Sequence, residues 1–334
     1  MRIPVILLAG PTASGKTALA CALADRLAPR LPVELVSVDS AQVFRDMNVG
    51  TAKPDAATLA RYPHHLIDLI SPEESYSAGA FLRDVDTVVQ GITSRGHLPI
   101  LVGGTMMYFK VLIDGLSQLP PVDPALRQAI ETEAAAKGWP ALHAELAERD
   151  PEGAARIEPR HAQRVGRALE LVRATGKTLT ELYAKEIPVP DWMQGPLLRF
   201  ALIPNDRAAL HAQINQRFSQ MLTDGLVDEV ARLRERYTLH PELPSMRCVG
   251  YRQAWDFIEG RINRRELLAQ GSAATRQLAK RQLTWLRSLP FIPLEPTQPG
   301  HVESLMNQII SLAEAQPKTP PTREKPAATP PESA

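Results

Sequence analysis

The chain has 334 residues, of which 44% are hydrophobic and 22% charged, with 38 Lys and Arg against 37 Asp and Glu. This length suits two domains or one domain with an insertion, and the ordinary composition excludes a largely disordered or fibrous chain. The longest apolar run, Val5–Ala9, is far shorter than the roughly 18 residues of a membrane span. We therefore expect a soluble cytoplasmic protein without a secretory signal, and any nucleic-acid contact must come from local basic patches.

Three buried strands that alternate with helices are predicted in the first part of the chain. The strands fall at 4–9, 33–39 and 99–102, and helical spacing covers 16–27 and 78–91. Strands of this kind, buried on both faces, indicate an α/β fold with a parallel, doubly wound sheet.

The pattern changes after residue 117. A proline-rich segment precedes a long stretch of helical pattern that ends at Pro188 and Pro190, which predicts an all-helical insertion domain over 118–190. The core, begun at 1–117, is expected to resume over 191–312.

The second part of the core is predicted to complete the sheet and to add two helices. Its elements are a strand at 197–202, a helix capped by Asn205 or Asp206 and running to Arg236, a helix at 272–289 and a strand at 291–294. Residues 313–334 are rich in proline and have no large apolar side chain, so a disordered tail is expected.

A phosphate-binding motif follows the first strand. It consists of Gly10, Pro11, Thr12, Ala13, Ser14, Gly15, Lys16 and Thr17. This P-loop pattern lies between a strand and a helix, where backbone N–H groups and Lys16 can hold phosphate oxygens and Thr17 can bind Mg²⁺. The fold class is therefore a P-loop NTPase-like parallel sheet with helices on both faces, plus the helical insertion.

Two further polar residues follow predicted strands. Asp39 ends the second strand, where a carboxylate is either an ordinary Mg²⁺ ligand or, beside bound phosphate, a base for an attacking nucleophile. Thr105 follows the third strand at the edge where open α/β sheets bind ligands, although a helix cap is an equally good interpretation.

Six motifs occur in an order and spacing that resemble the bacterial tRNA dimethylallyltransferases, also called tRNA isopentenyltransferases. They are Gly10–Thr17, Ser37–Phe44, Gly50–Pro54, His65–Asp68, Gly103–Tyr108 and Arg247–Arg252. The resemblance spans roughly residues 4–295 and implies transfer of a prenyl group from dimethylallyl diphosphate to the exocyclic amine of the adenosine on the 3′ side of the anticodon. It also implies that the P-loop holds a diphosphate with Mg²⁺ and that the enzyme acts on tRNA. We expect a monomer.

The resemblance assigns roles to four catalytic candidates. Asp39 corresponds to a general base or hydrogen-bond acceptor for the amine, and Thr105 to a residue at the reacting centre. Arg127 and Arg217 match positions linked to the active site and to the charge of the leaving group.

RNA contacts are implied at three places besides a turn that would read a flipped-out adenine, formed by Asp39, Ser40, Ala41 and Gln42. Gln42 has the alternative role of capping that turn. The other implied contacts are Gln163, Arg164, Arg167, Arg247, Cys248, Val249, Gly250, Tyr251, Arg252, Lys280, Arg281, Gln282, Leu283, Thr284, Trp285, Leu286 and Arg287.

Several of these residues have an alternative interpretation. Cys248, Val249 and Trp285 are expected to pack inward, while Arg160, Arg164 and Arg167 form a one-sided row if all are helical. Such rows fit phosphate contacts, although a solvated helix face is their commoner meaning. An ATP-dependent small-molecule kinase and an RNA-binding P-loop regulator remain the alternative functions.

Overall fold

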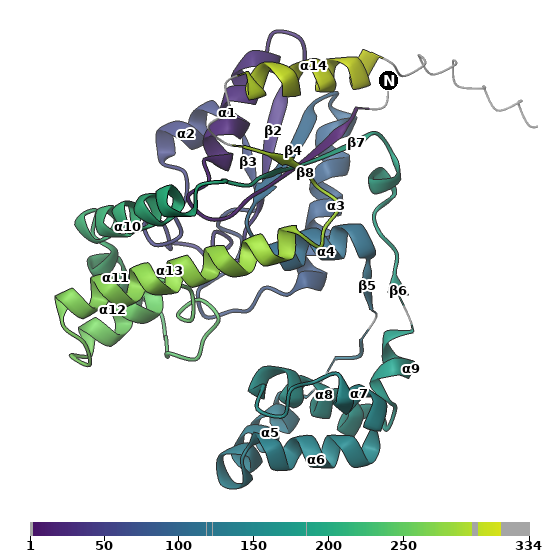
Figure 1. Cartoon of the computed structure of the whole chain (residues 1–334), viewed down its shortest axis with the longest axis vertical. Helices are drawn as coiled ribbons and strands as arrows, with labels where there is room; N and C mark the ends of the chain where they lie inside the picture. Colours follow the sequence, from purple (N-terminus) through teal and green to yellow (C-terminus); the bar gives the residue numbers. More distant parts are fainter. Residues whose placement is uncertain (1–2, 118, 122, 185, 296–299, 315–334) are drawn as a thin grey trace, which may run out of the picture. The chain divides into compact units, whose positions relative to one another are not determined.

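The computed structural model describes residues 3–117, 119–121, 123–184, 186–295 and 300–314. The chain divides into two compact units. The sheet unit comprises Met1–Phe109 and Asp191–Ala334, and the helical unit comprises Lys110–Pro190 (Figure 1).

The sheet unit is built on six parallel strands in the order β3-β2-β4-β1-β7-β8. The strands are β1 (Val5–Ala9), β2 (Val33–Val38), β3 (His64–His65), β4 (Leu98–Gly103), β7 (Leu197–Leu202) and β8 (Ile292–Leu294). This confirms the parallel α/β sheet. Strand β3 has two residues, too few to show a periodic pattern in the sequence.

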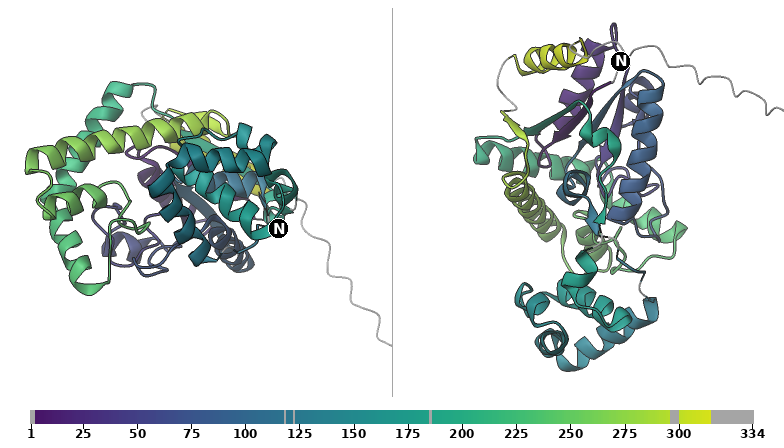
Figure 2. Two further views of the ribbon diagram at one scale, coloured as in Figure 1. Left: turned by 90° about the horizontal axis from the view of Figure 1, so that it is seen from below. Right: turned by 90° about the vertical axis from the view of Figure 1, so that its right-hand side faces the viewer.

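Helices cover both faces of this sheet, and Figure 2 shows α1 and α3 on opposite sides. The helices are α1 (Lys16–Leu27), α2 (Ala56–Arg61), α3 (Ala78–Ser94), α4 (Met106–Asp114), η1 (Asp191–Gln194), α10 (Arg207–Thr223), α11 (Leu226–Arg236), α12 (Tyr251–Ile258), α13 (Arg264–Leu286) and α14 (His301–Glu314). Alternation along β1 explains the layering, because Ile6 and Leu8 pack with α1 and α14 in one hydrophobic core. Helix α3 packs on β2 and β4 through a buried apolar stripe that begins at Phe81.

Local sequence determines where several helices begin and end. The Asp206 carboxylate accepts hydrogen bonds from the N–H groups of Ala208 and Ala209, so Asp206 caps α10. The single helix predicted to reach Arg236 is wrong, since Gly225 adopts φ 95° and separates α10 from α11.

Two C-terminal boundaries also differ from the expectation. Helix α13 begins at Arg264 after an Asn263 cap, well before residue 272. Helix α14 was not predicted, and it includes residues 313 and 314 of the expected tail. The rest of that tail lies outside the described residues.

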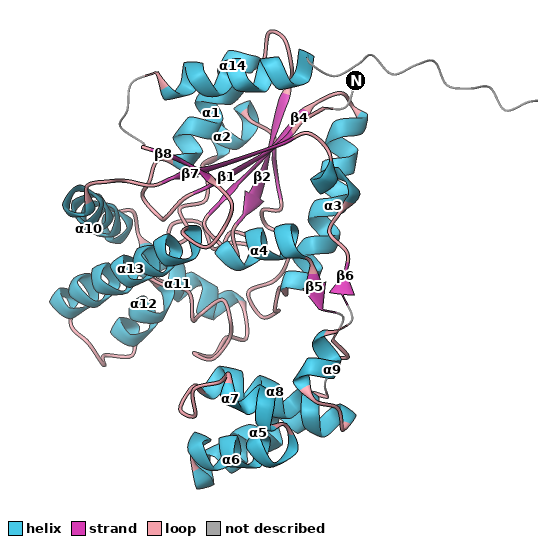
Figure 3. Cartoon of the chain, turned by 45° about the vertical axis from the view of Figure 1, so that its right-hand side comes forward, coloured by secondary structure: helices cyan, strands magenta, loops and turns pink. Residues whose placement is uncertain are grey.

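The helical unit has its own core. Its helices are α5 (Pro124–Lys137), α6 (Trp139–Arg149), α7 (Pro151–Ala155), α8 (Ala162–Thr175) and α9 (Leu179–Tyr183). Buried side chains of α6 and α8, including Leu146 and Leu169, form that core. The unit is not wholly helical, because β5 (Leu116–Ser117) and β6 (Glu186–Ile187) form an antiparallel pair (Figure 3).

No helix within the described ranges combines the length and apolar character that a bilayer crossing requires.

Candidate active site

The carboxyl ends of β1, β2 and β4 open onto a cleft of about 630 Å³. The P-loop follows β1, the Asp39 turn follows β2, and the Gly103–Thr105 turn follows β4; all three line this cleft. Its other walls come from α10 and α13, which pack against each other, and from the segments at 50–54 and 244–249. The described lining residues all belong to the sheet unit, as expected for a crevice at the carboxyl edge of a parallel sheet.

The P-loop presents unused polar groups to the cleft. Gly15 adopts φ 82° just before α1, and a Cβ there would meet no atom within 4 Å, so the backbone side of the loop is open. The Ser14 hydroxyl is buried and has no hydrogen-bond partner among the described residues. Thr17 is exposed in the first turn of α1, where its hydroxyl can bind a metal ion held by phosphate. This arrangement fits an anion.

Positive charge dominates the described lining of the cleft. Lys16, Arg217, Arg247 and Arg281 face a single acid, Asp39. Burial lowers the pKa of Lys16 to about 8, Asp39 raises it, and Arg217 lowers it further. Burial also lowers the pKa of Arg217, while Asp39 opposes that shift. Because placing both cations here is costly without a counter-charge, a polyanionic ligand is the complementary occupant.

The turn after β2 fixes the Asp39 carboxylate at the cleft. Its Oδ1 accepts hydrogen bonds from the N–H groups of Ala41 at 2.8 Å and Gln42 at 3.3 Å. The neighbouring Ser40 N–H donates to Thr105 Oγ1 at 2.9 Å, and the Thr105 hydroxyl donates to Ser40 Oγ at 3.2 Å. Thr105 and Asp39 therefore meet at one edge, and the Thr105 hydroxyl is engaged with Ser40.

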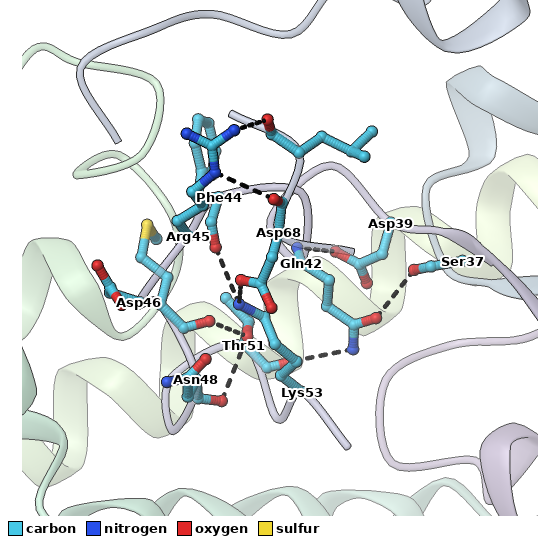
Figure 4. Close-up of polar contacts among 12 residues, drawn as sticks. Ser37, Asp39, Gln42, Phe44, Arg45, Asp46, Asn48, Thr51, Lys53 and Asp68 are labelled. Carbon is cyan, nitrogen blue, oxygen red and sulfur yellow. Dashed lines mark hydrogen bonds and ion pairs between the residues drawn. The ribbon is translucent and has the colours of Figure 1, made fainter. Parts of the chain in front are cut away.

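Gln42 is held by its own surroundings (Figure 4). Its Oε1 accepts a hydrogen bond from the Ser37 hydroxyl at 2.9 Å, and its Nε2 donates to the carbonyl oxygens of Thr51 and Ala52, each at 3.4 Å. The side chain thus braces the loop at 51–52. Reading a base would require these two long bonds to be exchanged, and that role stays a prediction.

An ion pair between a buried lysine and a partly exposed aspartate supports the same loop and explains two of the six motifs. The Lys53 ammonium donates to the Phe44 carbonyl at 2.9 Å and pairs with Asp68. The Arg45 guanidinium donates to the carbonyl oxygens of Asp68 and Leu69. The segments around Lys53 and Asp68 are therefore structural supports of the turn that carries Asp39 (Figure 4).

Tyr251 cannot contact RNA in this structure, although the sequence suggested it. Its ring is fully buried, and its hydroxyl donates to Glu229 Oε1 at 2.5 Å. The Glu229 carboxylate also accepts hydrogen bonds from the N–H groups of Asn48, Val49 and Gly50. Gly250 is likewise buried, whereas Arg247 and Arg252 are exposed.

The C-terminal end of α13 has an inner and an outer face. Lys280, Arg281, Thr284 and Arg287 are exposed, but Gln282 and Leu286 are buried. Leu283 packs with the core between α10 and α13. Leu286 faces the protein interior, so RNA contact by its side chain is wrong for this conformation. Gln282 lines the cleft with its amide bonded to the P-loop and to the turn after β4, and its RNA contact stays a prediction.

The sequence signature of the family described as IPP transferase matches residues 42–289 of the chain. A tRNA dimethylallyltransferase from Azoarcus sp. (strain BH72) is 61% identical, with 92% of this chain and 97% of that protein covered. One from Dechloromonas aromatica (strain RCB) is 58% identical, with 85% and 88% covered. The chain belongs to the IPP transferase family.

Solved structures agree with this assignment. The tRNA isopentenylpyrophosphate transferase of Bacillus halodurans has 32% sequence identity and a TM-score of 0.65, with 93% of this chain and 97% of that chain covered. A eukaryotic dimethylallyltransferase, described as acting on tRNA, shares the fold at 23% identity and a TM-score of 0.74, with 92% and 78% covered.

In this IPP transferase family member, two of the candidate site residues of the helical unit pair with Glu170. Arg127 Nε lies 2.7 Å from Glu170 Oε1, and Arg167 Nη1 lies 2.9 Å from Glu170 Oε2. Gln163 and Arg164 are exposed on α8, while Arg160 precedes the helix and so is not part of a helical row. The roles of Arg127, Gln163, Arg164 and Arg167 stay predictions.

The sequence interpretation missed the apolar wall of the cleft. It consists of Ile214, Phe218, Met221 and Leu278. The i, i+4, i+7 spacing on α10 could have indicated one face, but not the surface that it lines. Cys248, Val249 and Trp285 are half-buried and line the cleft, and Cys248 also packs against a hydrophobic core as expected.

Proposed function

We propose that the chain transfers the dimethylallyl group of dimethylallyl diphosphate to the exocyclic amine of the adenosine 3′-adjacent to the anticodon in tRNA. Diphosphate is released. The observation that carries this proposal is the cleft itself: a P-loop whose Ser14 hydroxyl is unpaired among the described residues, four cations, one carboxylate and an apolar wall, in a member of the IPP transferase family. The curated relatives named tRNA dimethylallyltransferase support the choice of substrates.

The P-loop side would bind the donor. Thr12 to Thr17 line the cleft and would surround the diphosphate, while Gly10 and Pro11 are buried and lead into this loop. The Ser14 hydroxyl and Lys16 would donate hydrogen bonds to it, and Arg217 would oppose the negative charge that grows on the leaving group. The apolar wall around Phe218 and Met221 offers a dry surface for the prenyl chain.

Mg²⁺ fits this site only together with the diphosphate. The described residues contain no group of three or more His, Cys, Asp or Glu side chains that could hold a metal. We therefore assign one protein ligand, the Thr17 hydroxyl, because Mg²⁺ commonly keeps few protein ligands and binds phosphate oxygens. When bound, the ion neutralises charge on the leaving diphosphate.

The Asp39 side would activate the acceptor. The adenine nitrogen attacks the allylic carbon, the bond from that carbon to the diphosphate oxygen breaks, and the proton of the amine passes to the Asp39 carboxylate. The hydrogen bonds of the turn are made to Oδ1 of this carboxylate, so the carboxylate can still accept a further hydrogen bond or a proton. Thr105 is linked to this turn by the hydrogen bond that its hydroxyl oxygen accepts from the Ser40 N–H. Rate then comes from alignment and from stabilising the leaving group.

The RNA would be held by exposed basic residues. Arg247 and Arg281 line the cleft, and Lys280 and Arg287 extend the positive surface along α13. The target adenosine must leave its stack to reach Asp39, as in other enzymes that act on a base.

The test is an incubation of the purified full chain with Mg²⁺, unmodified tRNA carrying consecutive adenosines on the 3′ side of the anticodon, and dimethylallyl diphosphate. A parallel reaction contains ATP as the donor. Nucleoside mass spectrometry should detect a prenyl-sized mass gain on adenosine only with dimethylallyl diphosphate. No gain, with ATP consumed instead, would support the kinase alternative.

A further inference from the structure

Gln282 connects three segments that are distant in the sequence. It projects from α13 into the protein and is 8% exposed. Its Oε1 accepts a hydrogen bond from the Thr12 N–H of the P-loop at 2.9 Å, and its Nε2 donates to the Gly104 carbonyl at 2.8 Å. One amide group therefore joins the P-loop to the turn after β4.

The turn after β4 packs so closely against its neighbours that positions 103 and 104 have no room for a side chain. A Cβ on Gly104 would lie 2.6 Å from Gln282 Nε2 and 3.3 Å from the Gly10 carbonyl oxygen. A Cβ on Gly103 would lie 2.0 Å from the Val38 carbonyl oxygen. The two turns and β2 approach closely because both residues are glycines, and the Gln282 amide fills the position between the turns.

The two segments joined by Gln282 carry the two halves of the proposed reaction. The P-loop continues from Thr12 to Ser14 and Lys16, which would hold the leaving group. The other segment continues from Gly104 to Thr105, which is bonded to Ser40 beside Asp39.

We propose that Gln282 is a positioning residue that fixes the separation between the donor cradle, which is the P-loop at 10–17, and the acceptor turn, which is the Asp39 turn at 39–42. The proposal rests on the proposed function. In-line transfer requires the amine and the allylic carbon to be aligned, and a displacement of about 1 Å can lower a rate by about 10²-fold. An amide is suited to this place because it accepts from the N–H and donates to the carbonyl at the same time.

Two substitutions separate these contacts. Gln282→Met keeps the shape and removes both hydrogen bonds. Gln282→Glu keeps an acceptor for the Thr12 N–H but places a carboxylate oxygen against the Gly104 carbonyl, and only its protonated form regains a donor. Gln270→Met is the matched control, because Gln270 is exposed on the same helix.

For Gln282→Met we expect kcat to fall about 10- to 100-fold, with the affinity for inorganic pyrophosphate and the KM for tRNA changing by less than about threefold. The Thr12 amide should lose hydrogen-exchange protection by at least about tenfold. For Gln282→Glu, the ratio of its kcat to that of the wild type should rise as the pH is lowered. Gln270→Met should match the wild type, and thermal melts establish the folded fraction of each variant.

Two results would overturn the positioning role. One is a folded Gln282→Met protein with kcat within twofold of the wild type. The other is a loss of pyrophosphate affinity as large as the loss of kcat, since Gln282 would then act on the cradle alone. If the proposed function itself is wrong, the wild type will transfer no prenyl group, although it binds pyrophosphate and protects the Thr12 amide from exchange. That result differs from both of the results above.

Discussion

Strand β2 carries one carboxylate near its start and is followed by another at its end, and the two have different surroundings. Glu34 is buried and accepts hydrogen bonds from His65, Arg95 and His97. Asp39 is half-buried and accepts hydrogen bonds from the backbone of its own turn. Both are therefore oriented by the protein, but Asp39 alone lines the cleft.

The charge balance around the two carboxylates also differs. Burial raises the pKa of Glu34, but the hydrogen bonds from His65, Arg95 and His97 outweigh it and hold the pKa below its usual value. At the Asp39 end burial disfavours the charged forms of the cations, since it lowers the pKa of both Lys16 and Arg217. Glu34, whose charge is balanced by its neighbours, stabilises the fold. Asp39 faces more cations than it can balance, which is typical of a site that binds an anion.

The sharpest test of this contrast is Asp39→Asn. The amide keeps the shape but cannot take a proton, so kcat should fall by about 10²–10⁴-fold. Pyrophosphate should bind as well as to the wild type or better, because the positive charge of Lys16 and Arg217 is then less compensated. Steady-state kinetics and calorimetry measure the two quantities.

A large loss of pyrophosphate binding in Asp39→Asn would contradict the assignment as a base. It would mean that the carboxylate acts on the donor side, through a metal ion. Thermal melts of the variant control for folding, since the turn also uses Asp39 Oδ1.

The second prediction concerns Lys16, whose pKa is about 8. Below that pH its ammonium attracts the diphosphate; above it the free protein holds a neutral amine, so binding must take up a proton. The affinity for pyrophosphate should therefore fall by about tenfold between pH 7.5 and 9.5. Lys16→Met should weaken binding by about 10- to 100-fold at pH 7, as expected for a charged hydrogen bond of about 1.5–3 kcal/mol.

Lys16→Arg is the control, because its guanidinium stays protonated and the ionisation of pyrophosphate is unchanged. Calorimetry at pH 8.5 in two buffers of different ionisation enthalpy should detect proton uptake in the wild type beyond that in Lys16→Arg. Equal uptake in both proteins would show that Lys16 does not titrate in this range.

The sequence predicted the parts of the fold and site that depend on short segments. Apolar runs predicted the parallel sheet, and the P-loop, Asp39 and Thr105 follow strands directly, so they meet wherever the carboxyl ends of the strands meet. The break at Gly225 was missed because a glycine within a helical pattern is compatible with a continuous helix.

The remaining parts of the site depend on packing between distant segments. Phe218 and Gln282 enter the cleft because α10 and α13 pack beside the sheet, which no local pattern specifies. Tyr251 and Leu286 lie in basic motifs that indicated an RNA surface, but their helices turn these two side chains inward. A motif identifies a segment, and tertiary structure decides which of its side chains face the ligand.

The smallest effect on transfer is expected from Glu34→Gln, which tests the other side of the comparison. The variant loses charge-assisted hydrogen bonds with Arg95 and the two histidines, so its free energy of unfolding should fall by about 1–3 kcal/mol, while kcat of the folded protein stays within about twofold of the wild type. Glu242→Gln, at an exposed position, controls for the loss of one charge. Denaturant melts and kinetics at pH 7 measure both quantities.

The pH dependence of the Glu34 contribution has a defined sign. Because the folded-state pKa lies below the ordinary value of 4.5, the stabilisation is complete above that value and is lost as the pH falls through the folded-state pKa. The stability difference between wild type and Glu34→Gln should therefore be largest near neutrality and shrink below about pH 4.5. A loss of kcat in Glu34→Gln comparable to that in Asp39→Asn would break the comparison, because it would mean that the two ends of β2 act on the reaction together.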